Sequence, residues 1–218
     1  EIEFETMHPY FDNIRMPFHN ETYLKAWMEG TTGYPLIDAC MRCLQQTGWV
    51  PFRMRAMLVS FASYQLWLDW RHTAPHLARL FTDFEPGIHY SQFQMQSGVT
   101  GINAIRIYNP VKQSLDHDKK GNFIRKWIIE LRNVPEQWIH EPHLLTHDLK
   151  ERYGCLAYPE PLVDNKISIS HARARLADAL NQDNFAHHAK RVYQKLGSRN
   201  RPQARRKPEP KTKQLSLF

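Results

Sequence analysis

Apolar side chains occupy nearly every position between residues 49 and 70, whereas the flanking segments mix apolar and polar positions at helical spacing. Pro51 suits the first turn of a helix, because the N–H that proline lacks would have no partner there. Neither glycine nor proline follows before Pro75, so the pattern predicts a continuous helix of roughly 20 residues that is buried on all sides. Arg53 and Arg55 near its start argue against a membrane span and, as buried cations, require a carboxylate or an anionic ligand. We therefore expect this helix to form the wall of a site.

Capping and breaking residues predict further helices on both sides of this stretch. Asn20 caps one that Gly30 closes, and Pro35 opens the next, which Gly48 ends. The remaining helices are expected at residues 75–81, 123–131, 142–153, 170–180 and 184–196. No stretch alternates convincingly between apolar and polar residues, so the sequence predicts an all-α fold.

Residues 82–95 are the least periodic part of the chain. They are polar and aromatic and contain a Pro86-Gly87 break, although strong core segments stand on both sides. A long irregular segment inside a compact domain is usually functional. We therefore expect this segment to carry residues of a site.

Composition and charge limit the class of protein. Hydrophobic residues make up 42% of the chain and aromatic residues 12%, which is ordinary for a globular protein. Of the formal net charge of +7, the last 22 residues carry +6, so the rest of the chain is nearly neutral. Three cysteines favour a reducing compartment, and we interpret the Cys40–Cys43 pair as two small core residues one turn apart. Without a signal peptide or a membrane span, the cytoplasm is the expected location.

The last 22 residues form a basic tail rich in proline and charge, which predicts disorder. Apolar residues cluster at its tip, where they cannot help folding, and short apolar anchors on flexible tethers are typical docking peptides. The predicted docking residues are Gln214, Leu215, Leu217 and Phe218.

A set of short motifs, standing in constant order between Trp27 and Pro142, resembles the photolyase/cryptochrome family of flavoproteins. The motifs are Trp27–Pro35, Asp38 with Met41-Arg42, Thr47–Trp49, Arg53–Arg55, Leu68–Arg71, Arg106–Pro110 and Gly121–Trp127. The resemblance implies the carboxy-terminal part of that family's all-α FAD-binding domain over residues 1–196, incomplete at its amino-terminal side, with the tail at 197–218. It also implies DNA repair by a blue-light-dependent lyase, which transfers an electron from FAD to a pyrimidine dimer flipped out of DNA.

The resemblance also implies roles for single residues. Arg55 corresponds to the arginine beside the flavin, and its aspartate partner corresponds to Asp83. Glu85 falls where the family has a second acid near the ribose and the flavin edge. His89 falls where a residue faces flavin N5 and tunes its protonation, so it is expected to bind the cofactor and to take part in catalysis.

Three further positions correspond to the family's DNA-lesion pocket. Arg53 and Arg106 match residues that line it, and Met95 falls where an aromatic residue often stacks on the lesion. These residues are therefore predicted to bind DNA with ultraviolet lesions.

The sequence departs from the family at the electron relay and beside the cofactor. Phe52 replaces a common asparagine, which removes a possible hydrogen bond to FAD. Of the three relay tryptophans only Trp70 is present, while Phe93 and Phe18 occupy the proximal and distal positions. A different electron-transfer path to the flavin is therefore an alternative, and its candidate residues are Tyr64, Trp67, Tyr90 and Tyr108. We expect Trp70 to remain a catalytic electron carrier.

The family's antenna domain, its phosphate-binding segment and a helix bearing a tryptophan and a glutamate would all precede Glu1. Because those parts bind the FAD diphosphate, we expect tight FAD binding to need them. The tail tip resembles the peptide by which bacterial repair proteins bind the sliding clamp. Three functions thus remain open: a photolyase, a cryptochrome-like photoreceptor without repair activity, and a flavin-free module that binds DNA or the clamp.

Overall fold

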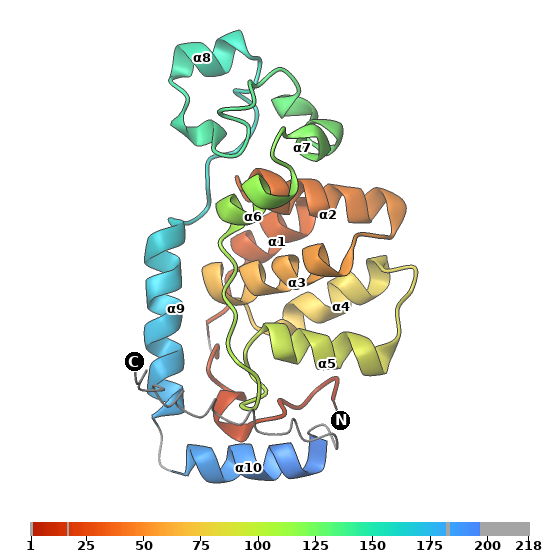
Figure 1. Ribbon diagram of the computed structural model, residues 1–218, viewed down its shortest axis with the longest axis vertical. Coiled ribbons are helices and arrows are strands. Elements are labelled where there is room, and N and C mark those ends of the chain that lie inside the picture. The colour runs from red at the N-terminus through yellow and green to blue at the C-terminus, as the bar shows by residue number, and fades with distance from the viewer. Residues whose placement is uncertain (1, 17, 182–183, 197–218) are drawn as a thin grey trace, which may run out of the picture.

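The computed structural model describes residues 2–16, 18–181 and 184–196, and this part of the chain consists of helices without a strand (Figure 1). The α-helices are α1 Glu21–Glu29, α2 Pro35–Thr47, α3 Phe52–Ser60, α4 Trp70–Leu80, α5 Pro86–Gln96, α6 Pro110–His117, α7 Asn122–Trp127, α8 His147–Arg152, α9 Asn165–Leu180 and α10 Phe185–Leu196. Shorter helical turns occur at Pro9–Phe11, Phe61–Gln65, Ile129–Leu131 and Pro142–Leu144. The predicted all-α class is confirmed. Among the described residues, none of the helices combines the length and apolar character needed to cross a bilayer.

Helices α1 to α6 form the main body, α7 and α8 form a smaller lobe at one end, and α10 lies across the opposite end (Figure 1). Helix α9 runs along the side of the main body and packs on the turn at 61–65. Helix α2 contacts α1, α6 and α7, while α5 contacts both α3 and α4. The main hydrophobic core therefore lies between α1–α5, and a second one lies inside the α7–α8 lobe.

The first two helices begin and end where the sequence predicts. The Asn20 side chain accepts a hydrogen bond from the Tyr23 N–H at 3.0 Å and so caps α1. Gly30 and Gly48 end α1 and α2 with φ values of 68° and 71°, a conformation that strongly favours glycine. The local capping signals were sufficient here.

The long central helix is not continuous, which corrects the sequence prediction. Helix α3 gives way after Ser60 to a wider π-helical turn, where the Leu66 N–H bonds to the Phe61 carbonyl. Trp67 then adopts a φ of 54°, which is incompatible with a right-handed helix. Asp69 starts α4 by accepting a hydrogen bond from the Arg71 N–H at 2.8 Å, so Pro75 lies inside α4 instead of opening it.

Most of the stretch predicted to be irregular is helix α5. Glu85 caps this helix by accepting a hydrogen bond from the Ile88 N–H at 2.6 Å, and Pro86 occupies its first turn. Polar residues on its buried side, among them Gln94 at 0% exposed, hide the helical pattern. Only residues 81–85 connect α4 to α5 as a loop.

Three later boundaries also differ from the prediction. The stretch 123–131 divides into α7 and a short turn, and 142–153 divides into a turn and α8. Helix α9 begins five residues early, at Asn165, because Asp164 accepts a hydrogen bond from the Ile167 N–H and caps it. Helix α10 agrees with the predicted 184–196 to within one residue.

A buried carboxylate joins α2 to the α7–α8 lobe. Asp38 is 0% exposed and accepts hydrogen bonds from the Thr32 N–H, the Thr32 hydroxyl, the Gly33 N–H and the Tyr158 hydroxyl at 2.6–3.0 Å. Burial raises the pKa of Asp38, and these four bonds oppose that effect. The main-chain bond from Leu162 to Thr32 closes the same connection.

The amino-terminal segment packs against the main body. The Gln94 side chain accepts a hydrogen bond from the Met7 N–H and donates to the Ile2 and Glu5 carbonyls. His8 is 0% exposed and stacks on Phe185 of α10, with 4.2 Å between the ring centroids. This segment therefore positions α10.

Candidate functional site

A pocket of about 170 Å³ opens between the start of α3, the loop at 81–85 and α5. Four phenylalanines contribute to its walls, and charged and polar side chains lie among them. The residues that line it are Phe52, Arg55, Ala56, Val59, Phe81, Asp83, Phe84, Glu85, Ile88, His89, Gln92, Phe93 and Gln96. Such a mixture of apolar walls with a few polar groups is typical of a ligand site.

The structure brings Arg55 and Asp83 together. Two parallel hydrogen bonds of 2.9 and 3.0 Å join the guanidinium to the carboxylate. The Arg55 Nε donates to the Val50 carbonyl at 2.8 Å, and the guanidinium carbon lies 4.3 Å from the Phe81 ring centre. These contacts fix the guanidinium in one orientation.

The Arg55 hydrogen bond holds the pKa of Asp83 below its ordinary value. A lowered pKa means that the pair stabilises the fold above the unfolded-state pKa of about 3.9 and that this contribution is lost as the pH falls through the lowered value. Since the Asp83 side chain is 52% exposed, the contribution to stability is small. The pair is therefore a positioning device that remains intact at neutral pH.

His89 lies on the inner side of α5 and is 7% exposed. Its Nε2 is 3.0 Å from the Ala74 carbonyl, which can only accept, so Nε2 carries the proton. Burial lowers the pKa of His89 and the charge of Arg55 lowers it further, while the bond to Ala74 opposes both effects. His89 is therefore neutral at pH 7, and its Nδ1 is an acceptor.

Glu85 also lines the pocket, but its carboxylate is committed to capping α5. Because it is exposed, it can reach solvent and the pocket mouth. Thus the four predicted cofactor residues, Arg55, Asp83, Glu85 and His89, come from three segments and line a single pocket.

Sequence reasoning missed Gln92, which stands one turn after His89. Its buried Oε1 has no hydrogen-bond partner among the described residues, although it lines the pocket. A buried acceptor of this kind suits a ligand that brings an N–H or O–H donor. The spacing of His89, Gln92, Phe93 and Gln96 is that of one helix face, and it is visible in the sequence once Glu85 is recognised as a cap.

The predicted DNA-binding residues lie outside the lining of this pocket. Arg53 and Arg106 are exposed and Met95 is half-buried. The prediction that Arg53 is a buried cation is wrong, because the first turn of α3 faces solvent. The Ser60 hydroxyl donates to the Arg106 carbonyl at 3.4 Å and so ties this segment to the end of α3.

Trp70 is fully buried at the start of α4, where its Nε1 donates to the Thr6 hydroxyl. Its indole contacts the Tyr90 ring edge-on at 6.5 Å between centroids. Tyr90 in turn lies 5.1 Å from His89 and 6.3 Å from Phe84, which both line the pocket. A chain of aromatic contacts thus runs from Trp70 to the pocket.

The other aromatic candidates are less suited to carry charge. Trp67 lies between two cations, with the guanidinium carbons of Arg15 and Arg175 at 4.8 and 4.9 Å from its ring centre. Burial raises the pKa of Tyr64 to about 12, and its hydroxyl has no partner among the described residues. Phe18 lines a separate cavity of about 300 Å³ beside these two residues. The proposed docking residues Gln214–Phe218 lie outside the described residues.

Comparisons with known proteins identify the family of this chain. A family model described as the FAD binding domain of DNA photolyase matches residues 1–178. The deoxyribodipyrimidine photo-lyase of Alkalihalophilus pseudofirmus is 37% identical over 153 residues, which cover 67% of this chain and 32% of that protein. The chain therefore spans about a third of the length of this relative.

Two solved structures share the fold. A bacterial class III photolyase from Agrobacterium tumefaciens superposes with a TM-score of 0.77 and 29% identity over 84% of this chain and 39% of that one. A cryptochrome from Synechocystis superposes with a TM-score of 0.73 and 30% identity over 79% and 36% of the two chains. The chain is thus similar in fold both to a photolyase and to a cryptochrome.

Proposed function

Because the chain belongs to the family of the FAD-binding domain of DNA photolyase, we propose that it supplies the helical, flavin-holding part of a light-dependent DNA repair lyase. The substrate of this activity is a pyrimidine dimer in DNA. The observation that carries the proposal is the pocket itself, where the Arg55–Asp83 pair, neutral His89 and four phenylalanines meet.

The pocket residues fit a flat aromatic cofactor that carries hydrogen-bond donors and acceptors. Phe81, Phe84 and Phe93 offer apolar contact, and the unpartnered Gln92 Oε1 offers an acceptor. We propose that Arg55, Asp83, Glu85 and His89 hold FAD, which supplies light-driven electron transfer when bound.

Arg55 with its partner Asp83, and His89, have distinct tasks in the proposal. Arg55 keeps a cation at a fixed place beside the cofactor, because Asp83 and the Val50 carbonyl hold its guanidinium from two sides. His89 can accept a proton or a hydrogen bond at Nδ1, since Nε2 is bound to Ala74. The buried rings of Phe81 and Phe93 give the site an apolar inner wall.

The DNA substrate is proposed to contact Arg53, Met95 and Arg106. Exposed arginines at the start of α3 and beside its end are available to phosphates, as protein–DNA recognition requires. Met95 is half-buried on the last turn of α5, the same helix that carries His89.

We further propose that electrons reach the pocket through Trp70 and Tyr90. The two rings are in edge contact, whereas the two cations beside Trp67 oppose its oxidation. Replacing Trp70 or Tyr90 with phenylalanine is expected to slow light-driven reduction of bound FAD at least about tenfold, an increase in activation free energy of about 1.4 kcal/mol. Transient absorption after a blue flash measures this rate.

Trp67→Phe serves as the matched control for the relay. It removes a buried aromatic of the same kind, and the rate of FAD reduction is expected to stay within about twofold of the unchanged protein. Should Trp67→Phe slow the reduction while Tyr90→Phe does not, the relay assignment is wrong.

The function is tested by adding FAD to the chain and then irradiating a thymine-dimer oligonucleotide with blue light in its presence. Flavin binding followed by light-dependent loss of dimers supports the lyase. Flavin binding without repair points to a cryptochrome-like photoreceptor. Absence of flavin binding, with DNA or clamp binding retained, points to the flavin-free module. The same assay on a longer parent protein that carries the diphosphate-binding segments tests whether tight binding depends on them.

Two further parts of the proposal concern partners and location. The tail peptide Gln214–Phe218 is proposed to bind the bacterial sliding clamp, which would raise the local concentration of the protein at DNA. A synthetic peptide with this sequence that fails to bind the clamp at tens of micromolar would exclude it. The cytoplasm is the proposed location, which is in accord with three buried cysteines that are all free.

A further inference from the structure

Helix α10 carries a row of basic side chains on its outer side. His187, Arg191 and Lys195 are spaced by four residues, so they lie on one face, and Lys190 stands next to this row. All four side chains are exposed. No acidic residue occurs between 185 and 196, so lysine and arginine carry all the formal charge on this helix.

The opposite side of α10 fixes the direction in which this row faces. Phe185 stacks on buried His8, and Val192 is 8% exposed, seven residues or two turns further along. The apolar side is therefore covered by the amino-terminal segment, while the basic side chains stay exposed along the rest of the helix surface.

No acidic side chain among the described residues pairs with the lysines and arginine of this helix. Lys190, Arg191 and Lys195 form no ion pair with any described residue. Like charges four residues apart on a helix repel by about 0.2–0.5 kcal/mol per pair. A polyanion bound along the row would remove this repulsion, whereas within the described protein nothing does.

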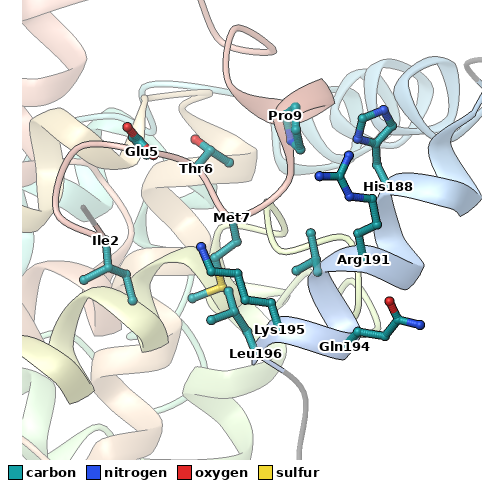
Figure 2. A pocket seen from close by; sticks show the side chains of 11 residues that line it. Ile2, Glu5, Thr6, Met7, Pro9, His188, Arg191, Gln194, Lys195 and Leu196 are labelled. Atoms are coloured by element: carbon teal, nitrogen blue, oxygen red, sulfur yellow. The ribbon is translucent and has the colours of Figure 1, made fainter.

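A groove of about 690 Å³ runs between α10 and the amino-terminal segment. Figure 2 shows the side chains of Arg191 and Lys195 pointing from α10 toward the amino-terminal segment that carries Thr6, Met7 and Pro9. Glu5 is the one acid in the lining, which also contains the basic residues Arg191 and Lys195. The groove extends the positive surface along the edge of the helix.

We infer that α10 binds the phosphate backbone of double-stranded DNA without regard to sequence or lesion. Helix α10 begins at residue 185, after the stretch 1–178 that the family model matches. In the sequence, α10 is followed by the basic stretch 197–213. Electrostatic contacts of this kind position a protein on DNA and steer its approach.

A membrane surface is the other polyanion that a basic amphipathic helix can bind. Binding to a bilayer requires an exposed apolar side, and in α10 that side packs on the rest of the protein through Phe185 and Val192. Binding to nucleic acid requires only the basic side of α10, so the structure favours nucleic acid over a membrane.

The test compares two triple variants of the full chain. Lys190→Gln, Arg191→Gln and Lys195→Gln remove the row, while Lys119→Gln, Lys120→Gln and Arg132→Gln remove three exposed charges near α7 as the matched control. Fluorescence anisotropy with a short undamaged duplex, in the dark and without FAD, measures affinity from about 50 to 200 mM salt. These conditions keep the result separate from flavin binding and repair.

The α10 variant is expected to bind about tenfold more weakly near 100 mM salt, and the slope of log K against log salt should fall by about 2 to 3. The control variant should stay within about twofold of the unchanged chain. Equal losses in both variants would indicate net charge alone and overturn the inference. So would unchanged DNA binding, including the case in which only binding to phosphatidylserine vesicles declines.

Discussion

Replacing Asp38 with alanine is expected to lower the free energy of unfolding by about 4 kcal/mol, because four buried donors lose their shared acceptor. The donors belong to the turn before α2 and to Tyr158 near the chain's second core. The substitution thus loosens the connection between the α7–α8 lobe and the main body. Urea unfolding followed by circular dichroism measures the effect.

Two variants make this result specific to the network. Asp116→Ala removes an exposed carboxylate that pairs with Lys112 on α6, and its effect should stay within about 0.5 kcal/mol. Tyr158→Phe removes one donor and should cost about 1–2 kcal/mol. Combined with Asp38→Ala, the Tyr158 change should add little, because the acceptor is already gone. Full additivity of the two changes would contradict the shared network.

Replacing Arg55 with alanine is expected to weaken FAD binding by about tenfold to hundredfold, since a charge-assisted contact is worth about 1.5–3 kcal/mol. The change removes the guanidinium, leaves Asp83 unpaired and exposes the face of Phe81. Quenching of flavin fluorescence measures the affinity.

Arg42→Ala is the matched control. Arg42 also forms a bidentate pair, with Glu130 at 2.8–3.0 Å, and both partners are about as buried as Arg55, but neither lines the pocket. This control should lower stability and leave FAD affinity within about twofold. A loss of FAD affinity as large as that of Arg55→Ala would show that the effect is global.

The same pair predicts how flavin affinity depends on pH. Arg55 lowers the pKa of Asp83, so the pair stays ionised through the neutral and mildly acidic range. The ionisation of Asp83 should therefore leave FAD affinity constant from about pH 7 to pH 5. FAD affinity should fall only when the pH drops below the ordinary aspartate pKa of about 3.9.

Local signals predicted the elements whose boundaries depend on neighbours in sequence. Asn20, Gly30, Pro35 and Gly48 mark α1 and α2 because their capping geometry is a property of a few adjacent residues. The break after Ser60 was not predictable in this way. Trp67 adopts its positive φ in a packed setting, between the distant residues Arg15 and Arg175.

The sequence predicted the charged residues of the site, but only some of the residues that line its pocket. Arg55 signals a need for an anion by its place in an apolar stretch, and the family resemblance identified Asp83 as its partner. Gln92 was missed because the stretch 82–95 was interpreted as irregular, which concealed the face it shares with His89. Arg53, only two residues from Arg55, points to solvent because the helix turns by about 200° between them.

The turn at Phe61–Gln65 is wider than an α-helical turn, because the Leu66 N–H bonds to a carbonyl five residues back instead of four. The turn places Gln65 so that its amide donates to the Tyr108 carbonyl at 2.7 Å and to the Asn165 side chain at 3.3 Å. The length of this stretch is therefore as constrained as its hydrophobicity. A chain shorter by one residue here would keep its apolar character and lose the alignment between α3 and α9.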